Sequence, residues 1–178
     1  MKKKSTKSSI HISYQLVYAG TTKIIFTLPH KKIEINFTYL SNPLPKLLNA
    51  GAAINAAKPQ FHEIVFTDEP GCHKLQLIIT SKNKIQLSIY YHHCGFAIEK
   101  FRPLKKVKTG FNGKTVPLPI SSFKHIASFQ CSTKEFSAAL LSAMQQMLTT
   151  HTKAAYKQNW GYSFPSKQYS TFASTLLS

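Results

Sequence analysis

Acidic side chains are the scarcest group in this sequence: Asp and Glu together number 6 among 178 residues, against 23 Lys and Arg. The formal net charge at pH 7 is therefore +17. A field of this size attracts anions and speeds encounters with acidic surfaces, although it says nothing about the fold. So few carboxylates also weigh against acid–base catalysis and against nuclease sites with two divalent ions, because both need carboxylates at the site.

Arginine is almost absent, because every basic residue except Arg102 is lysine. A guanidinium group reads base edges and phosphates with paired hydrogen bonds, whereas an ammonium group acts as a point charge. We therefore expect general attraction to acidic partners and no sequence-specific reading of DNA. A genome rich in A and T is another source of lysine codons, but it does not account for the lack of acids.

Cysteines and long apolar runs are also few. Cys72, Cys94 and Cys131 show no paired spacing, which is a poor disulfide framework and favours reduced thiols. No run approaches the roughly 18 apolar residues of a membrane span. The N-terminal lysines are not followed by the apolar core of a signal peptide either. These absences predict a cytoplasmic protein with no membrane partner.

Apolar residues are numerous enough to fold the chain. Hydrophobic residues make up 43% of it and aromatic residues 12%, so burial can offset the entropy lost on ordering. The length is that of one domain. We predict a disordered basic arm over residues 1–8 and a single α+β domain over residues 9–178.

Alternation of apolar and polar residues predicts antiparallel strands joined by short turns. In the first and third strands the alternation places Tyr18 and Tyr39 on the same face as the apolar residues that precede them. In a later hairpin, a common apolar face requires Leu77 opposite Leu87, which sets Cys72 opposite His92. The expected strands are 10–18, 23–28, 32–39, 61–67, 72–80, 85–89, 95–101 and 124–130.

Three segments have the apolar spacing of helices. Asn42 is the expected cap of a helix that starts near residue 44 and is weakened by Gly51. Ser132 and Glu135 have the spacing of a capping box, which opens the strongest helix. A last helix is expected over 166–177, with Ser166 as its cap. The predicted fold is therefore α+β: an antiparallel β-sheet meander with one inserted helix and two C-terminal helices packed on one face.

The densest basic stretch follows the predicted strand 95–101, where prolines and glycines predict a long loop. Its basic and aromatic residues are the candidate partner-binding set: Lys100, Phe101, Arg102, Lys105, Lys106, Lys108, Phe111 and Lys114. Such side chains hold single-stranded nucleic acid by neutralising phosphates while bases stack on the rings. The alternative is that the lysines keep the loop solvated and the phenylalanines anchor it to the core.

Histidines and cysteines gather at one end of the same hairpin: Cys72, His73, His92, His93 and Cys94. Neighbours on a strand point to opposite faces, so at most two or three of them could reach one ion. We predict no metal site and no cofactor. Neither Cys94 nor Cys131 lies in a known nucleophile signature, and no glycine-rich phosphate loop is present, so we expect no enzymatic activity.

Two segments carry a resemblance to known proteins: Asp68-Glu69-Pro70-Gly71 before a hairpin, and Tyr156-Lys-Gln-Asn-Trp-Gly-Tyr-Ser-Phe-Pro165 after a long helix. Together they resemble small uncharacterised bacterial proteins in which a sheet precedes C-terminal helices. Size and layout also resemble the immunity proteins that neutralise secreted bacterial toxins. The resemblance implies stoichiometric binding of a toxin domain, and the positive charge of this chain predicts that this domain is acidic. The alternative is a sequence-tolerant nucleic-acid-binding protein that uses the Lys- and Phe-rich loop.

Overall fold

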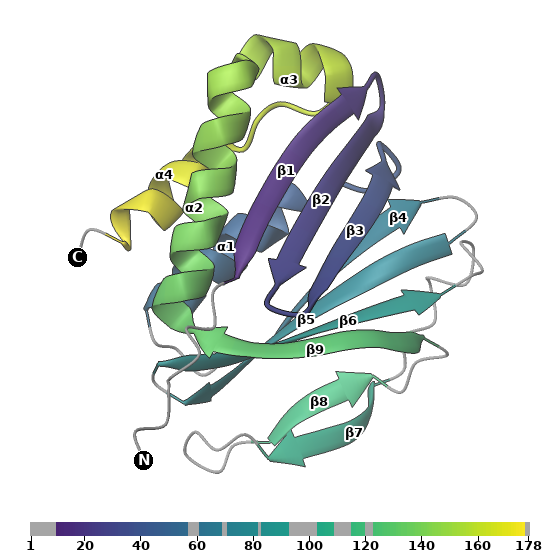
Figure 1. Cartoon of the computed structure of the whole chain (residues 1–178), viewed down its shortest axis with the longest axis vertical. Coiled ribbons are helices and arrows are strands. Elements are labelled where there is room, and N and C mark those ends of the chain that lie inside the picture. The colour runs from purple at the N-terminus through teal and green to yellow at the C-terminus, as the bar shows by residue number, and fades with distance from the viewer. Residues whose placement is uncertain are drawn as a thin grey trace.

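The computed structural model describes residues 10–56, 61–68, 71–81, 83–92, 103–108, 115–119 and 123–176. The predicted arm at 1–8 and the predicted strand at 95–101 lie outside these residues. The α+β class with antiparallel strands is confirmed. The strands are divided between a sheet of three and a sheet of four, with a separate two-stranded ribbon (Figure 1).

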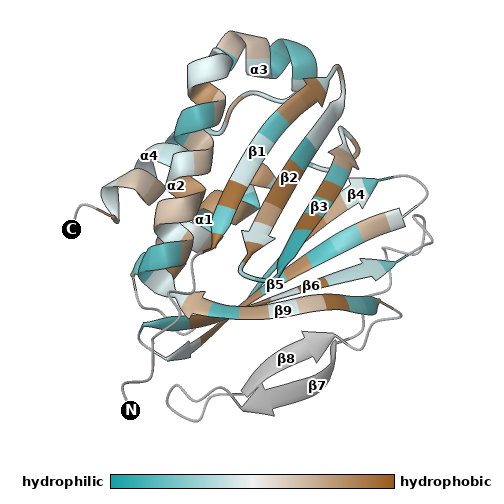
Figure 2. Ribbon diagram, viewed as in Figure 1, coloured by the Kyte–Doolittle hydropathy of each residue, from teal (hydrophilic) through white to brown (hydrophobic). Residues whose placement is uncertain are grey.

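The first sheet consists of β1 (His11–Tyr18), β2 (Thr21–Leu28) and β3 (Lys31–Thr38), in that order. Hydrophobic and hydrophilic residues alternate along β3, as Figure 2 shows, because neighbouring residues of a strand point to opposite faces. In β2, Ile24, Ile25 and Phe26 follow one another and all are buried. Gly20 sits in the β1–β2 turn with φ 77°, a backbone conformation that glycine adopts without steric cost.

The inward placement of Tyr18 and Tyr39 is wrong, since their exposed fractions are 66% and 58%. The pairing of β1 with β2 shifts between Leu16 and Tyr18, and Tyr39 lies beyond the end of β3. Alternation in the sequence therefore continues past the point where the regular ladder stops.

The second sheet has the order β4 (Phe61–Asp68), β5 (Gly71–Ser81), β6 (Lys84–His92) and β9 (Lys124–Ser132). The predicted register is confirmed, because Leu77 pairs with Leu87 and Cys72 with His92. The meander is broken after β3, where α1 (Leu44–Asn55) intervenes and β4 begins a new sheet.

A short ribbon replaces part of the predicted long loop. β7 (Pro103–Lys108) pairs antiparallel with β8 (Thr115–Pro119). The prolines at 103, 117 and 119 argued against strands here. In a ribbon of two strands each strand has an unpaired edge, which tolerates a residue that lacks an N–H group.

Three helices follow β9: α2 (Thr133–Thr150), α3 (Lys153–Trp160) and α4 (Ser166–Ser174). The capping box of α2 is confirmed, because the Ser132 hydroxyl accepts a hydrogen bond from the Glu135 N–H at 3.1 Å. The carboxylate of Glu135 in turn accepts one from the Ser132 N–H at 2.8 Å. The other two predicted caps are wrong, since α1 is capped at Pro43 and α4 at Pro165.

The sequence did not predict α3. This helix buries only Tyr156 and Trp160, so its apolar stripe is too narrow to stand out among polar residues. Both ends of the helix are capped by adjacent residues. At the N-terminus the Thr152 hydroxyl accepts a hydrogen bond from the Ala155 N–H at 3.1 Å, and at the C-terminus Gly161 has φ 81°.

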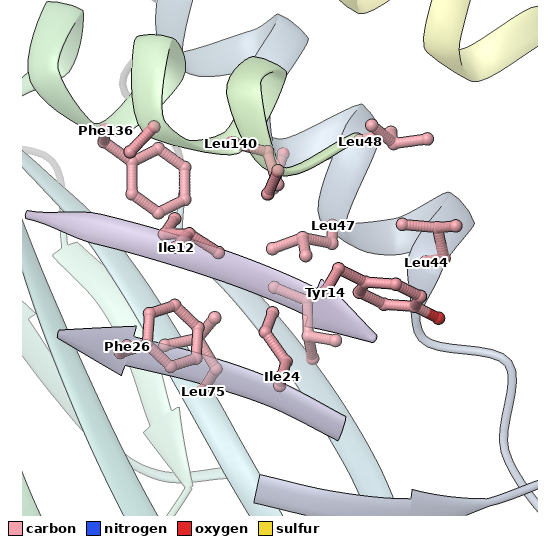
Figure 3. Packing of buried hydrophobic residues seen from close by; sticks show 14 of the residues in the cluster. Ile12, Tyr14, Ile24, Phe26, Leu44, Leu47, Leu48, Leu75, Phe136 and Leu140 are labelled. Carbon is pink, nitrogen blue, oxygen red and sulfur yellow. The ribbon is translucent and has the colours of Figure 1, made fainter. Parts of the chain in front are cut away.

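The core lies where both sheets meet α1 and α2. α2 packs along β1, and α1 packs against α2 and α4. In Figure 3, Phe136 and Leu140 of α2 face Ile12 of β1, and Leu47 of α1 lies beside them. None of the described helices is long and apolar enough to cross a membrane.

Candidate functional site

The predicted partner-binding residues fall partly on the ribbon. Lys105, Lys106 and Lys108 belong to β7, at register positions opposite Leu118, Pro117 and Thr115 of β8. The structure thus brings these lysines onto one short strand. The other candidates lie outside the described residues: Lys100, Phe101, Arg102, Phe111 and Lys114.

The acidic residue Glu34 forms two ion pairs on the first sheet. Its carboxylate lies 3.1 Å from the ammonium group of Lys23 and 2.6 Å from that of Lys32. Hydrogen bonds from Lys32 and Lys23 lower the pKa of Glu34. One carboxylate therefore forms ion pairs with two lysines.

Glu63 is the centre of a second cluster, on the face of the second sheet that bears Cys72. Its Oε2 lies 3.3 Å from Nζ of Lys74 and accepts a hydrogen bond from Gln76 at 3.2 Å. Lys74 is fully buried, and its Nζ lies 4.2 Å from the ring centre of Phe123. An ammonium group is buried at high cost unless charge and a ring face compensate it.

The remaining described acids are Glu135 and Asp68. Glu135 completes the capping box, and burial raises the pKa of Asp68. Exposed lysines, in contrast, are spread over both sheets and the helices. Within the part of the chain that the structure describes, these exposed lysines form no ion pair: Lys46, Lys84, Lys124, Lys134, Lys157 and Lys167.

A chain of hydroxyl and imidazole groups joins β6 and β9. The Ser128 hydroxyl lies 2.8 Å from the Ser88 hydroxyl and 2.8 Å from Nε2 of His125. A serine beside a histidine is the first half of a nucleophile–base pair, which needs a third group to orient the base. Among the described residues no carboxylate contacts His125. Its ring packs against that of Tyr90, with the two ring centres 5.3 Å apart.

The sequence did not predict this contact. Residues three apart on a regular strand point to opposite faces, so His125 and Ser128 give no signal of proximity. The pairing of β6 with β9 shifts between Ile89 and Tyr90, which brings both side chains to one face.

The described thiols are held in their protonated form. Burial raises the pKa of Cys72, and burial together with Glu135 raises the pKa of Cys131 to about 12. A thiol rather than a thiolate is a poor nucleophile and a poor metal ligand. His92 pairs with Cys72 across the ladder, while His93 and Cys94 lie outside the described residues. Where the structure describes the chain, no three His, Cys, Asp or Glu side chains are grouped to hold a metal.

Glu34, Glu63 and Glu135 thus bond groups of this chain, while several exposed lysines form no ion pair with any described residue. No protein-family model matches this chain, and no curated protein or solved structure matches it.

Proposed function

We propose that this chain is a non-catalytic basic protein that binds an acidic protein partner stoichiometrically. The observation that carries the proposal is the way the described carboxylates are used. Glu34 and Glu63 bond lysines of the same sheet and Glu135 caps a helix. Exposed lysines such as Lys46, Lys124 and Lys157 form no ion pair among the described residues. The net charge of +17 produces a field that steers acidic surfaces into contact.

The absence of catalysis is supported by the chemistry of the described polar groups. Protonated thiols and a serine–histidine contact without an orienting carboxylate are poor starting points for covalent catalysis. Binding in stoichiometric amounts needs neither. It needs only surface complementarity and favourable charge.

The specific form we propose is neutralisation of a secreted bacterial toxin with an acidic domain. The support is the resemblance in size and layout to immunity proteins, together with a charge suited to fast association. A protein that must intercept a toxin before it acts gains from a high association rate, which electrostatic steering provides.

The test is native mass spectrometry of the tagged chain purified from its own host without nuclease treatment. We expect a complex of fixed stoichiometry with an acidic protein, and an association rate that falls as salt rises. A variant with Lys46, Lys124 and Lys157 changed to Gln is expected to associate more slowly. Recovery of nucleic acid alone, with no acidic protein, would overturn the proposal.

The second candidate is sequence-tolerant binding of nucleic acid, and the observation in its favour is the ribbon. β7 has the sequence Pro-Leu-Lys-Lys-Val-Lys, which places three lysines on a narrow two-stranded element. This candidate predicts that the logarithm of affinity for a single-stranded oligonucleotide falls linearly with the logarithm of salt, with a slope set by the phosphates neutralised. Affinity that does not change with salt would exclude it.

A further inference from the structure

The large exposed hydrophobic side chains of the described residues gather at one end of the molecule. They form what we call the tyrosine end: Val17, Tyr18, Tyr39, Leu40 and Tyr162. These residues come from the end of β1, the segment after β3 and the segment after α3. In Figure 1 this end lies beside α3, at the opposite extreme from β7 and β8.

Two main-chain hydrogen bonds and one from a tyrosine hydroxyl join these three segments to one another. The Gly20 N–H donates to the Asn159 carbonyl at 2.6 Å, and the Tyr39 N–H donates to the Gly20 carbonyl at 3.1 Å. The Tyr162 hydroxyl donates to the Tyr39 carbonyl at 3.0 Å. The backbone that carries the rings is therefore held in place before a partner binds. Less conformational entropy is then lost on binding.

A groove of about 370 Å³ runs between the segments. It is lined by Tyr39, Tyr162, Gly20 and Gly161, together with Trp160, which is only 1% exposed. Clefts that hold small ligands are typically about 300 to 1,000 Å³. Tyrosine, which supplies three of the exposed side chains here, is also enriched among the residues that dominate binding energy at protein interfaces.

The charge around the groove decides which partner fits. Residues 17–20, 39–40 and 157–162 contain one charged side chain, Lys157, and no carboxylate. A second copy of the chain would bring another charge of +17 and be repelled. A nucleic-acid strand carries a phosphate at every nucleotide and needs a row of cations along its path, which these segments do not offer.

An acidic protein segment with an apolar or aromatic anchor fits both the tyrosine-lined groove and the positive charge of the chain. We propose that the tyrosine end docks such a segment: the anchor enters the groove, and flanking carboxylates meet Lys157 and the phenol groups of Tyr18 and Tyr39. This inference rests on the proposed function and locates the centre of its interface. It follows the usual arrangement of an apolar centre inside a polar rim.

Defined polymers test the inference. Fluorescence anisotropy would compare poly-L-glutamate, a random glutamate–tyrosine copolymer and a single-stranded oligothymidine on the wild-type chain. We expect the copolymer to bind about tenfold more tightly than poly-L-glutamate, which corresponds to about 1.4 kcal/mol. The variant Tyr18→Ser/Tyr39→Ser should lose this preference, and Tyr18→Phe/Tyr39→Phe should keep most of it.

The controls separate the two proposals. Lys134→Ala, on α2 and away from the groove, should weaken both acidic polymers equally. If the wild-type chain binds neither acidic polymer, the proposed function fails and this inference with it. If it binds both equally, or if the serine variant keeps the preference, only the tyrosine end is overturned. Tyrosine-dependent preference for oligothymidine would also overturn it, in favour of nucleic acid.

Discussion

At the scale of single residues, Lys74 departs furthest from what its side chain favours. Lysine is almost never fully buried without a partner, and here it lies within the second sheet between Glu63 and the ring of Phe123. A charge in that position is tolerated only while its neighbours compensate for the lost hydration. The stability of β4 and β5 therefore depends on Glu63.

Glu63→Gln should lower the free energy of unfolding by about 1–3 kcal/mol, because Lys74 loses the compensating charge of Glu63 while hydrogen-bonding capacity remains. Urea denaturation measures the change. Glu34→Gln is the matched control: its pairs are exposed, and a much smaller change is expected. Adding Lys74→Met to Glu63→Gln should recover much of the loss. An unchanged urea midpoint for Glu63→Gln would contradict this account.

Acid should destabilise the protein through His62 and His73. Burial lowers the pKa of both, so the folded state resists protonation while the unfolded state takes up protons near pH 6.5. Stability should then be constant above that pH and fall as the pH drops through and below it. Thermal unfolding from pH 8 to pH 5 measures the trend. The variant His62→Gln/His73→Gln should show a shallower fall, and an equal fall would contradict the assignment.

At the scale of elements, α1 shows how packing overrides helix propensity. Gly51 is an unfavourable residue in a helix interior, yet it lies where α1 meets α2 and α4. A Cβ atom at this position would be 2.7 Å from Cε2 of Phe172 and 3.2 Å from Cδ2 of Leu140. The glycine permits the close approach of three helices.

Gly51→Ala should therefore destabilise the protein, although alanine gains about 1 kcal/mol in helix propensity. Overpacking of the buried Phe172 ring is expected to leave a net loss of about 1–2 kcal/mol. Differential scanning calorimetry measures it. Adding Phe172→Leu should cost less in the Gly51→Ala background than in the wild type, since the smaller side chain makes room. Additive losses would argue against a steric cause.

Features fixed by neighbouring residues were predictable from the sequence. The capping box of Ser132 and Glu135 and the pairing of Leu77 with Leu87 depend on short-range chemistry and a single apolar face. The division into two sheets depends on how α1 fits between distant segments. The sequence did not predict the strands of the ribbon, because a strand tolerates prolines only on an unpaired edge.

The candidate surfaces were predictable only in part. Composition alone indicated a basic surface, but nothing in the sequence distinguishes the buried Lys74 from the exposed lysines. Tyr18 and Tyr39 continued the apolar alternation of their strands, so the sequence placed them in the core. Their exposure follows from where the ladders end, and the groove beside them needs Trp160 from the far end of the chain.

At the scale of the whole molecule, the net charge of +17 acts against the compact state. Like charges repel more strongly when folding brings them together, and salt screens this repulsion. The melting temperature should rise by a few degrees as sodium chloride increases from about 0.02 to 0.3 M. Sucrose of matched osmolality is the control for general solute effects. A flat or falling melting temperature would show that the lysines are spaced too far apart to matter.

The packing of α2 along β1 has a consequence for biosynthesis. The strand β1 is among the first described segments to leave the ribosome, and α2 follows much later. At roughly 5–20 residues per second, the β1–β3 sheet waits several seconds for α2 to cover its apolar face. During that time the nascent chain exposes Ile12 and Phe26, which are buried in the finished protein. We expect cellular chaperones to bind the growing chain over this interval and to release it once α2 docks on β1.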